Sequence, residues 1–336
     1  MVAWIKLPRN QKLAIITNVA NRKGYNEQVV EKDIWVTLAL EALFGLPEIG
    51  NNLVFKGGTS LSKGYNLIDR FSEDIDFAID RKFLGFHQET LSNTKIKHLR
   101  RASSDFARET LAPGLLAKLL EMGVPEGEFK VLYNAEVEPD TDPLPIHIEY
   151  KPVAGNSNYL ADKVILEVGA RSLMEPAEKR TIQSFVAEVY AGEDFAGMPF
   201  EVSTVIPGRT FLEKIFLIHE QFQLADQSPP RNRMSRHLYD IEKLMDTTNA
   251  TNALRDKDLY EHIVAHRKAL TPIKGITYEK HIPSEIAILP PPEMMDLWEK
   301  DYSQFIDQMV VGKKLKFGEL ITRLTQLQES IRAIKW

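Results

Sequence analysis

The spacing of hydrophobic and polar positions changes along the chain, from helical periodicity to strand-like alternation and back. In residues 31–44 apolar side chains recur at every third or fourth position, which predicts an amphipathic helix. Residues 74–79 instead alternate polar and apolar side chains, which predicts a half-buried strand. Asp74 and Asp76 should therefore share one face of that strand, with the apolar side chains on the other.

The same pattern predicts a sheet in the first part of the chain and helices in the last part. The expected strands are 53–55, 74–79, 129–138, 146–153, 163–169 and 199–206. Residues 1–50 are expected to form helices, among them 31–44, and further helices are expected at 61–68, 85–122, 210–224, 233–246, 256–268 and 293–333. This order predicts a mixed α/β (α+β) fold, with a mixed sheet flanked by helices and a C-terminal helical domain. We expect domains at 1–206 and 207–336.

Composition narrows the class of protein without identifying it. The chain has 336 residues, 42 Lys and Arg against 47 Asp and Glu, a net charge of −5 and no cysteine. The missing cysteines exclude a disulfide scaffold, a thiolate zinc site and a cysteine nucleophile. No apolar run is long enough for a membrane span, and the N-terminus does not resemble a secretory signal.

A glycine turn followed by paired carboxylates is the strongest chemical feature of the sequence. A glycine turn between a strand and a helix lets backbone N–H groups approach a phosphate closely. Two carboxylates on one strand face suit a divalent cation such as Mg²⁺, which takes oxygen ligands. Phosphate binding beside such a pair is what metal-assisted nucleotidyl transfer requires. The residues concerned are Gly57, Gly58, Thr59, Ser60, Asp74 and Asp76.

These residues resemble the first motif of the AbiEii-type nucleotidyltransferase toxins, members of the DNA polymerase β-like nucleotidyltransferase superfamily. Four further segments resemble that family in the same order, over most of residues 29–330. In chain order, the matching segments are Glu31–Thr37, Phe55–Leu61 with Arg70–Phe77, Leu166–Ser172, Arg209–Lys214 and Ser235–Asp240. The interval between Gly58 and Asp74 is longer than in minimal members of the superfamily, so the loop around Arg70 is expected to have a function of its own.

The resemblance implies roles for individual residues. Glu167 would join Asp74 and Asp76 as the third metal ligand, although Glu149 has a similar local sequence. Lys214 would bind the triphosphate, and Asp240 would orient that lysine or the nucleotide. The residues expected to bind the nucleotide are Gly57, Gly58, Thr59, Ser60, Arg70, Ser72 and Lys214.

Each role has a structural alternative. Lys214 could lie on a solvated helix face, and Asp240 could form a surface ion pair. Arg70 could pair with Glu73 instead of offering its guanidinium to phosphate. Lys56 and Lys63, which flank the turn, could either neutralise phosphate or be exposed. His147, His219 and His237 are interpreted as structural. Basic residues at 95–101, with Arg231, Arg233 and Arg236, could face RNA or simply solvent.

The resemblance also implies a location and a function: a cytoplasmic bacterial toxin of a two-component toxin–antitoxin or abortive-infection system. It would use Mg²⁺ to transfer a nucleotide from an NTP, plausibly to the 3′ end of tRNA, and a cognate antitoxin would be encoded nearby. Two alternatives remain open at this point. One is a nucleotide- or RNA-binding module without turnover, and the other is an adenylyltransferase that modifies a small molecule. The sequence does not identify the base transferred or the oligomeric state.

Overall fold

The protein divides into two compact units, which are described separately. The structure is a computed structural model that describes residues 1–72, 74–155, 161–224 and 233–336. Unit 1 comprises Met1–Tyr65 and Phe71–Val205, and unit 2 comprises Asn66–Arg70 and Ile206–Trp336. Within these residues, no helix combines the length and the apolar character that a membrane span requires.

Unit 1 is built on a mixed sheet, which is seven-stranded in the residues described, in the order β3-β4-β5-β2-β1-β7-β6. The pairs β2/β5 and β1/β7 are parallel, and the other neighbours are antiparallel. The mixed sheet confirms the predicted fold class. The strands are β1 (Leu53–Lys56), β2 (Asp74–Ile79), β3 (Phe129–Tyr133), β4 (Leu144–Tyr150), β5 (Lys163–Gly169), β6 (Ala177–Ile182) and β7 (Phe200–Val205).

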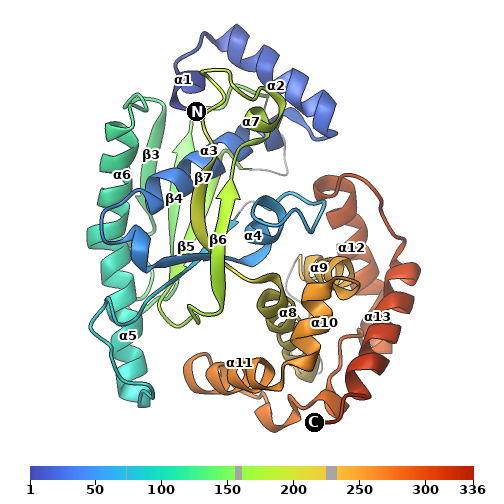
Figure 1. Cartoon of the computed structure of the whole chain (residues 1–336). Coiled ribbons are helices and arrows are strands. Elements are labelled where there is room, and N and C mark those ends of the chain that lie inside the picture. Colours follow the sequence, from blue (N-terminus) through green and yellow to red (C-terminus); the bar gives the residue numbers. More distant parts are fainter. Residues whose placement is uncertain (73, 156–160, 225–232) are drawn as a thin grey trace. The chain divides into compact units, whose positions relative to one another are not determined.

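Helices flank this sheet, with α3 lying across it and α6 beside α3 (Figure 1). A π-helical stretch, Ala107–Leu111, joins α5 to α6. The helices of unit 1 are α1 (Val2–Ile5), α2 (Arg9–Lys23), α3 (Glu27–Phe44), α4 (Gly57–Lys63), α5 (Asn93–Phe106), α6 (Ala112–Glu121) and α7 (Phe185–Val189).

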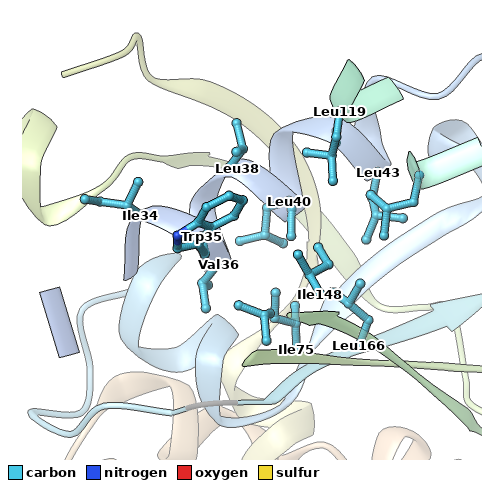
Figure 2. Packing of buried hydrophobic residues seen from close by; sticks show 14 of the residues in the cluster. Ile34, Trp35, Val36, Leu38, Leu40, Leu43, Ile75, Leu119, Ile148 and Leu166 are labelled. Carbon is cyan, nitrogen blue, oxygen red and sulfur yellow. The ribbon is translucent and has the colours of Figure 1, made fainter. Parts of the chain in front are cut away.

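Helix α3 forms the centre of the core of unit 1. Figure 2 shows its apolar side chains packed toward Ile75, Ile148 and Leu166 of the sheet, with Leu119 of α6 nearby. The prediction of a one-sided amphipathic helix is wrong here, because nearly every side chain of α3 is buried, including Glu31 and Asp33. A helix covered on all sides is a core element, and its buried charges need partners.

In the residues described, unit 2 is mainly helical, and the short segment Asn66–Arg70 joins it from the first part of the chain. Arg70 forms an isolated antiparallel bridge with Val310, and the Val311 N–H donates to the Asp69 carbonyl at 2.9 Å. The long helix expected at 293–333 is two helices. The helices are α8 (Pro207–Gln223), α9 (Ser235–Met245), α10 (Thr248–Arg255), α11 (Lys257–Leu270), α12 (Met295–Met309) and α13 (Phe317–Arg332).

Candidate active site

The carboxylates predicted to hold a metal lie on two neighbouring parallel strands. In the register of β2 and β5, Asp76 is opposite Glu167 and Asp74 is opposite Ile165. Asp74, Asp76 and Glu167 alternate with buried apolar residues and are themselves half-buried. Since side chains alternate between the faces of a sheet, the three carboxylates share the face opposite the apolar core.

The register also separates the two candidates for the third carboxylate. Glu149 on β4 is exposed and lies opposite Lys163, at the start of β5. Lys163 is four residues before Glu167, a distance of about 13 Å along an extended strand. Glu149 therefore lies on the same face as Asp76 but one strand further away, displaced along the sheet.

Gly57 brings backbone against the Asp76 carboxylate. It opens α4 with φ of +79°, a left-handed conformation that side-chain-bearing residues rarely adopt. A Cβ atom at this position would meet the Asp76 carboxylate, at 2.9 Å from its Cγ. Glycine is thus required twice, by the backbone angle and by the neighbouring carboxylate. The helix begins at Gly57 itself, earlier than the predicted start at 61.

The hydroxyl groups of the turn are used within the protein. The Thr59 hydroxyl donates to the backbone carbonyl of Asp74, and the Ser60 hydroxyl donates to the Gly57 carbonyl at 2.8 Å. Both side chains are buried. Their hydroxyl protons hold α4 to β2 and close its first turn, rather than pointing to an external phosphate. Lys63 is not exposed either, since it forms an ion pair with Asp33 of α3.

A second group of predicted residues forms a buried charge cluster in unit 2. The Arg70 guanidinium donates to both carboxylate oxygens of Asp240, from Nε to Oδ1 at 2.6 Å and from Nη2 to Oδ2 at 2.8 Å. Lys214 on α8 contacts the same carboxylate, Nζ to Oδ2 at 2.8 Å. The side chains of Arg70, Lys214 and Asp240 are 4%, 8% and 0% exposed, so the solvated alternatives for Lys214 and Asp240 are wrong.

Electrostatics within this cluster favour an ionised Asp240. Burial alone would raise the pKa of Asp240, but Arg70 and Lys214 hold it well below its ordinary value. Burial lowers the pKa of Lys214, against the attraction of Asp240. Burial and the Lys214 charge also lower the pKa of His237, whose Nδ1 lies 3.4 Å from Lys214 Nζ. The imidazole is therefore neutral at pH 7.

His237 is a site residue that the sequence interpretation missed. The sequence around His237 has no metal-binding spacing, which favours a structural interpretation. Its position three residues before Asp240 is the sequence feature that indicates a place in the site, because residues three apart lie on one helix face.

The remaining predicted residues are distributed over both units. Ser72 is half-buried and lies just before β2. Arg171, in the segment that matches the second motif, donates from Nε to Asp142 Oδ2 at 2.7 Å. The basic stretch at 95–101 lies on α5, with Lys95, Lys97 and Arg101 exposed. Glu73 and Arg231 lie outside the residues that the structure describes.

The donor set on the sheet fits a hard divalent cation. It consists of carboxylate oxygens alone, and the absence of a side chain on Gly57 lets the Asp76 carboxylate lie against the backbone that opens α4. In the described part of the chain, no group of three or more His, Cys, Asp or Glu side chains is placed to hold a metal ion, and Asp74, Asp76 and Glu167 form no such group. Their role as metal ligands therefore stays a prediction.

Comparisons with known proteins identify the family of this chain. The family model described as "Nucleotidyl transferase AbiEii toxin, Type IV TA system" matches residues 38–323. Among solved structures, the chain is similar to MenT4, a nucleotidyltransferase toxin from Mycobacterium tuberculosis H37Rv, with 17% identity and a TM-score of 0.46 over 95% of this chain and 98% of that one. Comparison with curated protein sequences gave no significant match. The family model spans most of the chain, including both groups of charged residues, and the protein therefore belongs to the AbiEii family of nucleotidyltransferase toxins.

Proposed function

We propose that the protein transfers a nucleotide from an NTP to a hydroxyl at the 3′ end of tRNA, with Mg²⁺ as the cofactor. The observation that carries this proposal is the direct pairing of Asp76 with Glu167 on adjacent strands, with the backbone of Gly57 against the Asp76 carboxylate. Carboxylates that share a sheet face beside a glycine-opened helix combine a cation site with a phosphate site. These are the two requirements of metal-assisted nucleotidyl transfer.

In this proposal, Asp74, Asp76 and Glu167 hold the divalent cation. When bound, Mg²⁺ would neutralise triphosphate charge and polarise the reacting oxygens. The backbone N–H groups of Gly57 and Gly58, which open α4, would donate to phosphate oxygens. Thr59 and Ser60 then act indirectly, because their hydroxyls fix the shape of that turn.

The charge cluster supplies a positive group for the triphosphate. Lys214 donates to phosphate oxygens, and Asp240 keeps the lysine charged and oriented. Ser72, next to the metal-binding strand, is also assigned to the nucleotide. A carboxylate of the sheet accepts the proton of the acceptor hydroxyl, whose oxygen bonds to the α-phosphorus as the bond to pyrophosphate breaks. Pyrophosphate is the leaving group.

The biological role in this proposal is growth inhibition. Modification of tRNA ends would stop translation in the cytoplasm, where NTPs and tRNA are available, and could abort a phage infection. The type IV family assignment implies a cognate antitoxin. The exposed basic side chains of α5 would contribute salt-dependent contacts to tRNA phosphates.

Labelled NTPs test the reaction directly. Full-length protein is incubated with each NTP in turn, Mg²⁺ and either total tRNA or an aminoglycoside. We expect label in tRNA from one or more NTPs, and a loss of about a hundredfold or more in Asp76→Asn and Glu167→Gln. Glu149→Gln is the matched control, because Glu149 lies on the same sheet face but opposite Lys163.

The control outcomes separate the alternatives. Label on the aminoglycoside alone would identify a small-molecule adenylyltransferase. NTP binding without any transfer or pyrophosphate release would indicate a binding module. Equal transfer by wild type and Asp76→Asn would contradict the proposed metal site.

A further inference from the structure

Three neighbouring strands of unit 1 bring a lysine into the row of the proposed metal ligands. Lys56, the last residue of β1, lies directly opposite Asp76 of β2, and Asp76 lies opposite Glu167 of β5. Side chains that lie opposite one another on paired strands project from the same face of the sheet. The backbone of Lys56 is therefore one strand spacing from Asp76, about 5 Å, and two spacings from Glu167, about 10 Å.

The residues next to Lys56 and Asp76 show that this face is the one away from the apolar core. Phe55 lies opposite Phe77 in the same register, and their ring centroids are 5.9 Å apart within the core of unit 1. Because successive side chains of a strand alternate between the faces, Lys56 and Asp76 take the face opposite these rings. Lys56 is half-buried there. Its side chain thus belongs to the face on which the metal is proposed to bind.

The two lysines that flank the glycine turn have different surroundings. Lys63 forms an ion pair with Asp33 of α3, and its side chain is only 5% exposed. Lys56 forms no ion pair with any residue that the structure describes, and its side chain does not cap α4. The carboxylate of Asp76 lies against Gly57 instead. Lys63 is therefore committed to the fold, whereas Lys56 is available to a ligand.

We propose that Lys56 is a phosphate-binding residue of the nucleotidyl-transfer site, whose ammonium group donates to an oxygen of the triphosphate that the metal holds beside Asp76 and Glu167. This inference rests on the proposed function and adds to it a cation from unit 1. A lysine suits this role because its flexible stem carries a compact charge with three donors. Its charge lies where the triphosphate and the carboxylates would otherwise repel one another.

Two ligands distinguish phosphate binding from a structural role, because Lys56 should act on them with opposite sign. Its ammonium repels a free divalent cation but attracts the oxygens of inorganic tripolyphosphate. Removal of the charge should therefore weaken the binding of tripolyphosphate with Mg²⁺. It should leave the binding of Mn²⁺ alone unchanged or make it tighter. If Lys56 merely supports the fold, its removal should weaken both.

Titration calorimetry on the full chain measures the binding of both ligands. Lys56→Met, which keeps an unbranched side chain, should bind tripolyphosphate with Mg²⁺ about tenfold more weakly than wild type, with no loss of affinity for Mn²⁺. Lys56→Arg, which keeps the charge, should stay within about threefold of wild type. Lys163→Met is the matched control. Lys163 is also half-buried on this face, but it lies about 13 Å along β5 from Glu167, so its loss should change neither affinity.

Four results would overturn the inference. They are tripolyphosphate binding by Lys56→Met equal to wild type, a parallel loss of Mn²⁺ affinity in that variant, an equal loss of tripolyphosphate affinity in Lys163→Met, and an equal loss in Lys56→Arg. The proposed function survives each of them if wild type still transfers labelled nucleotide. If wild type binds neither Mn²⁺, tripolyphosphate nor any NTP, the proposed function itself fails. Should Lys56→Met not fold, Lys56→Gln takes its place with the same expectations.

Discussion

A single hydrogen atom on Gly57 leaves room for the carboxylate of Asp76. We expect Gly57→Ala to reduce nucleotidyl transfer about a hundredfold, because the new methyl group displaces Asp76. Gly85→Ala is a matched control: Gly85 also has a positive φ, of +87°, but nothing lies within 4 Å of its added Cβ. Both variants should lose about 1 kcal/mol of stability from backbone strain.

Activity and thermal melting of the two variants test this explanation. Comparable melting temperatures with a large activity loss only at Gly57 would support displacement of Asp76. A similar activity loss in Gly85→Ala would attribute the effect to backbone strain in general.

Glu31 makes the stability of the protein pH-dependent. Burial raises the pKa of Glu31 from 4.5 to about 7, although the N–H groups of Val153 and Ala154 donate to its carboxylate. Between these two values the native state holds a proton that the unfolded chain has released. The free energy of unfolding should therefore fall by about 3 kcal/mol as the pH rises from 4.5 to 7.

Urea unfolding across this pH range, with Glu31→Gln and Glu149→Gln compared, measures the contribution. Glu31→Gln should remove this part of the pH dependence, while the exposed Glu149→Gln should keep the wild-type slope. An unchanged slope in Glu31→Gln would show that other groups cause it.

At the scale of elements, a buried ion pair joins α3 to α4. Asp33 on α3 accepts from Lys63 on α4 and from the Phe185 N–H at 2.7 Å, and burial raises the pKa of its carboxyl. Lys63→Met leaves that carboxyl without its cation. We expect a loss of about 3 kcal/mol in the free energy of unfolding.

A double-mutant cycle checks whether the pair or the side chains themselves matter. Adding Asp33→Asn to Lys63→Met should recover most of the loss, since no unpaired charge remains. If the two substitutions are additive in urea unfolding, the ion pair does not stabilise the junction of α3 and α4.

Strands with one buried face were predictable from sequence, and elements without that pattern were not. The alternation of residues 74–79 and the apolar run at 163–169 predict β2 and β5 at their observed positions. The pattern does not predict strand β6, because β6 is an edge strand with the charged sequence Ala-Glu-Lys-Arg-Thr-Ile. It does not predict helix α10 either, because that helix is rich in Thr and Asn.

The side-chain partners in the candidate site depend on tertiary contacts that local sequence does not encode. Alternation placed Asp74 and Asp76 on one face, but their position relative to Glu167 required the strand register. Arg70 and Asp240 are 170 residues apart, so their bidentate pairing leaves no local pattern. The sequence therefore predicts the residues of the candidate site more reliably than it predicts the side chains that each of them contacts.

At the scale of the whole molecule, unit 2 is discontinuous in sequence. Its helices begin at Ile206, yet Asn66–Arg70 belongs to it and supplies the main-chain partner of Val311 and the guanidinium that pairs with Asp240. We expect a fragment of residues 206–336 to lack a cooperative thermal transition, because loss of Arg70 leaves Asp240 with only part of its charge compensation.

Circular dichroism melting of this fragment, alone and with a synthetic peptide of residues 64–72, measures the dependence. The peptide should raise the melting temperature, and a peptide with Arg70→Gln should not. A fragment that melts cooperatively at the temperature of the full protein would contradict this expectation.

The late synthesis of Asp240 has a consequence for a member of a toxin family. Arg70 leaves the ribosome long before its partner, and at ordinary translation rates the 170 intervening residues take on the order of ten seconds to synthesise. Throughout that interval the nascent polypeptide has its glycine turn and its carboxylate strand but no completed cluster around Lys214. Translation products that end before Asp240 are therefore expected to lack transfer activity, because Lys214, which is proposed to bind the triphosphate, has no completed cluster around it.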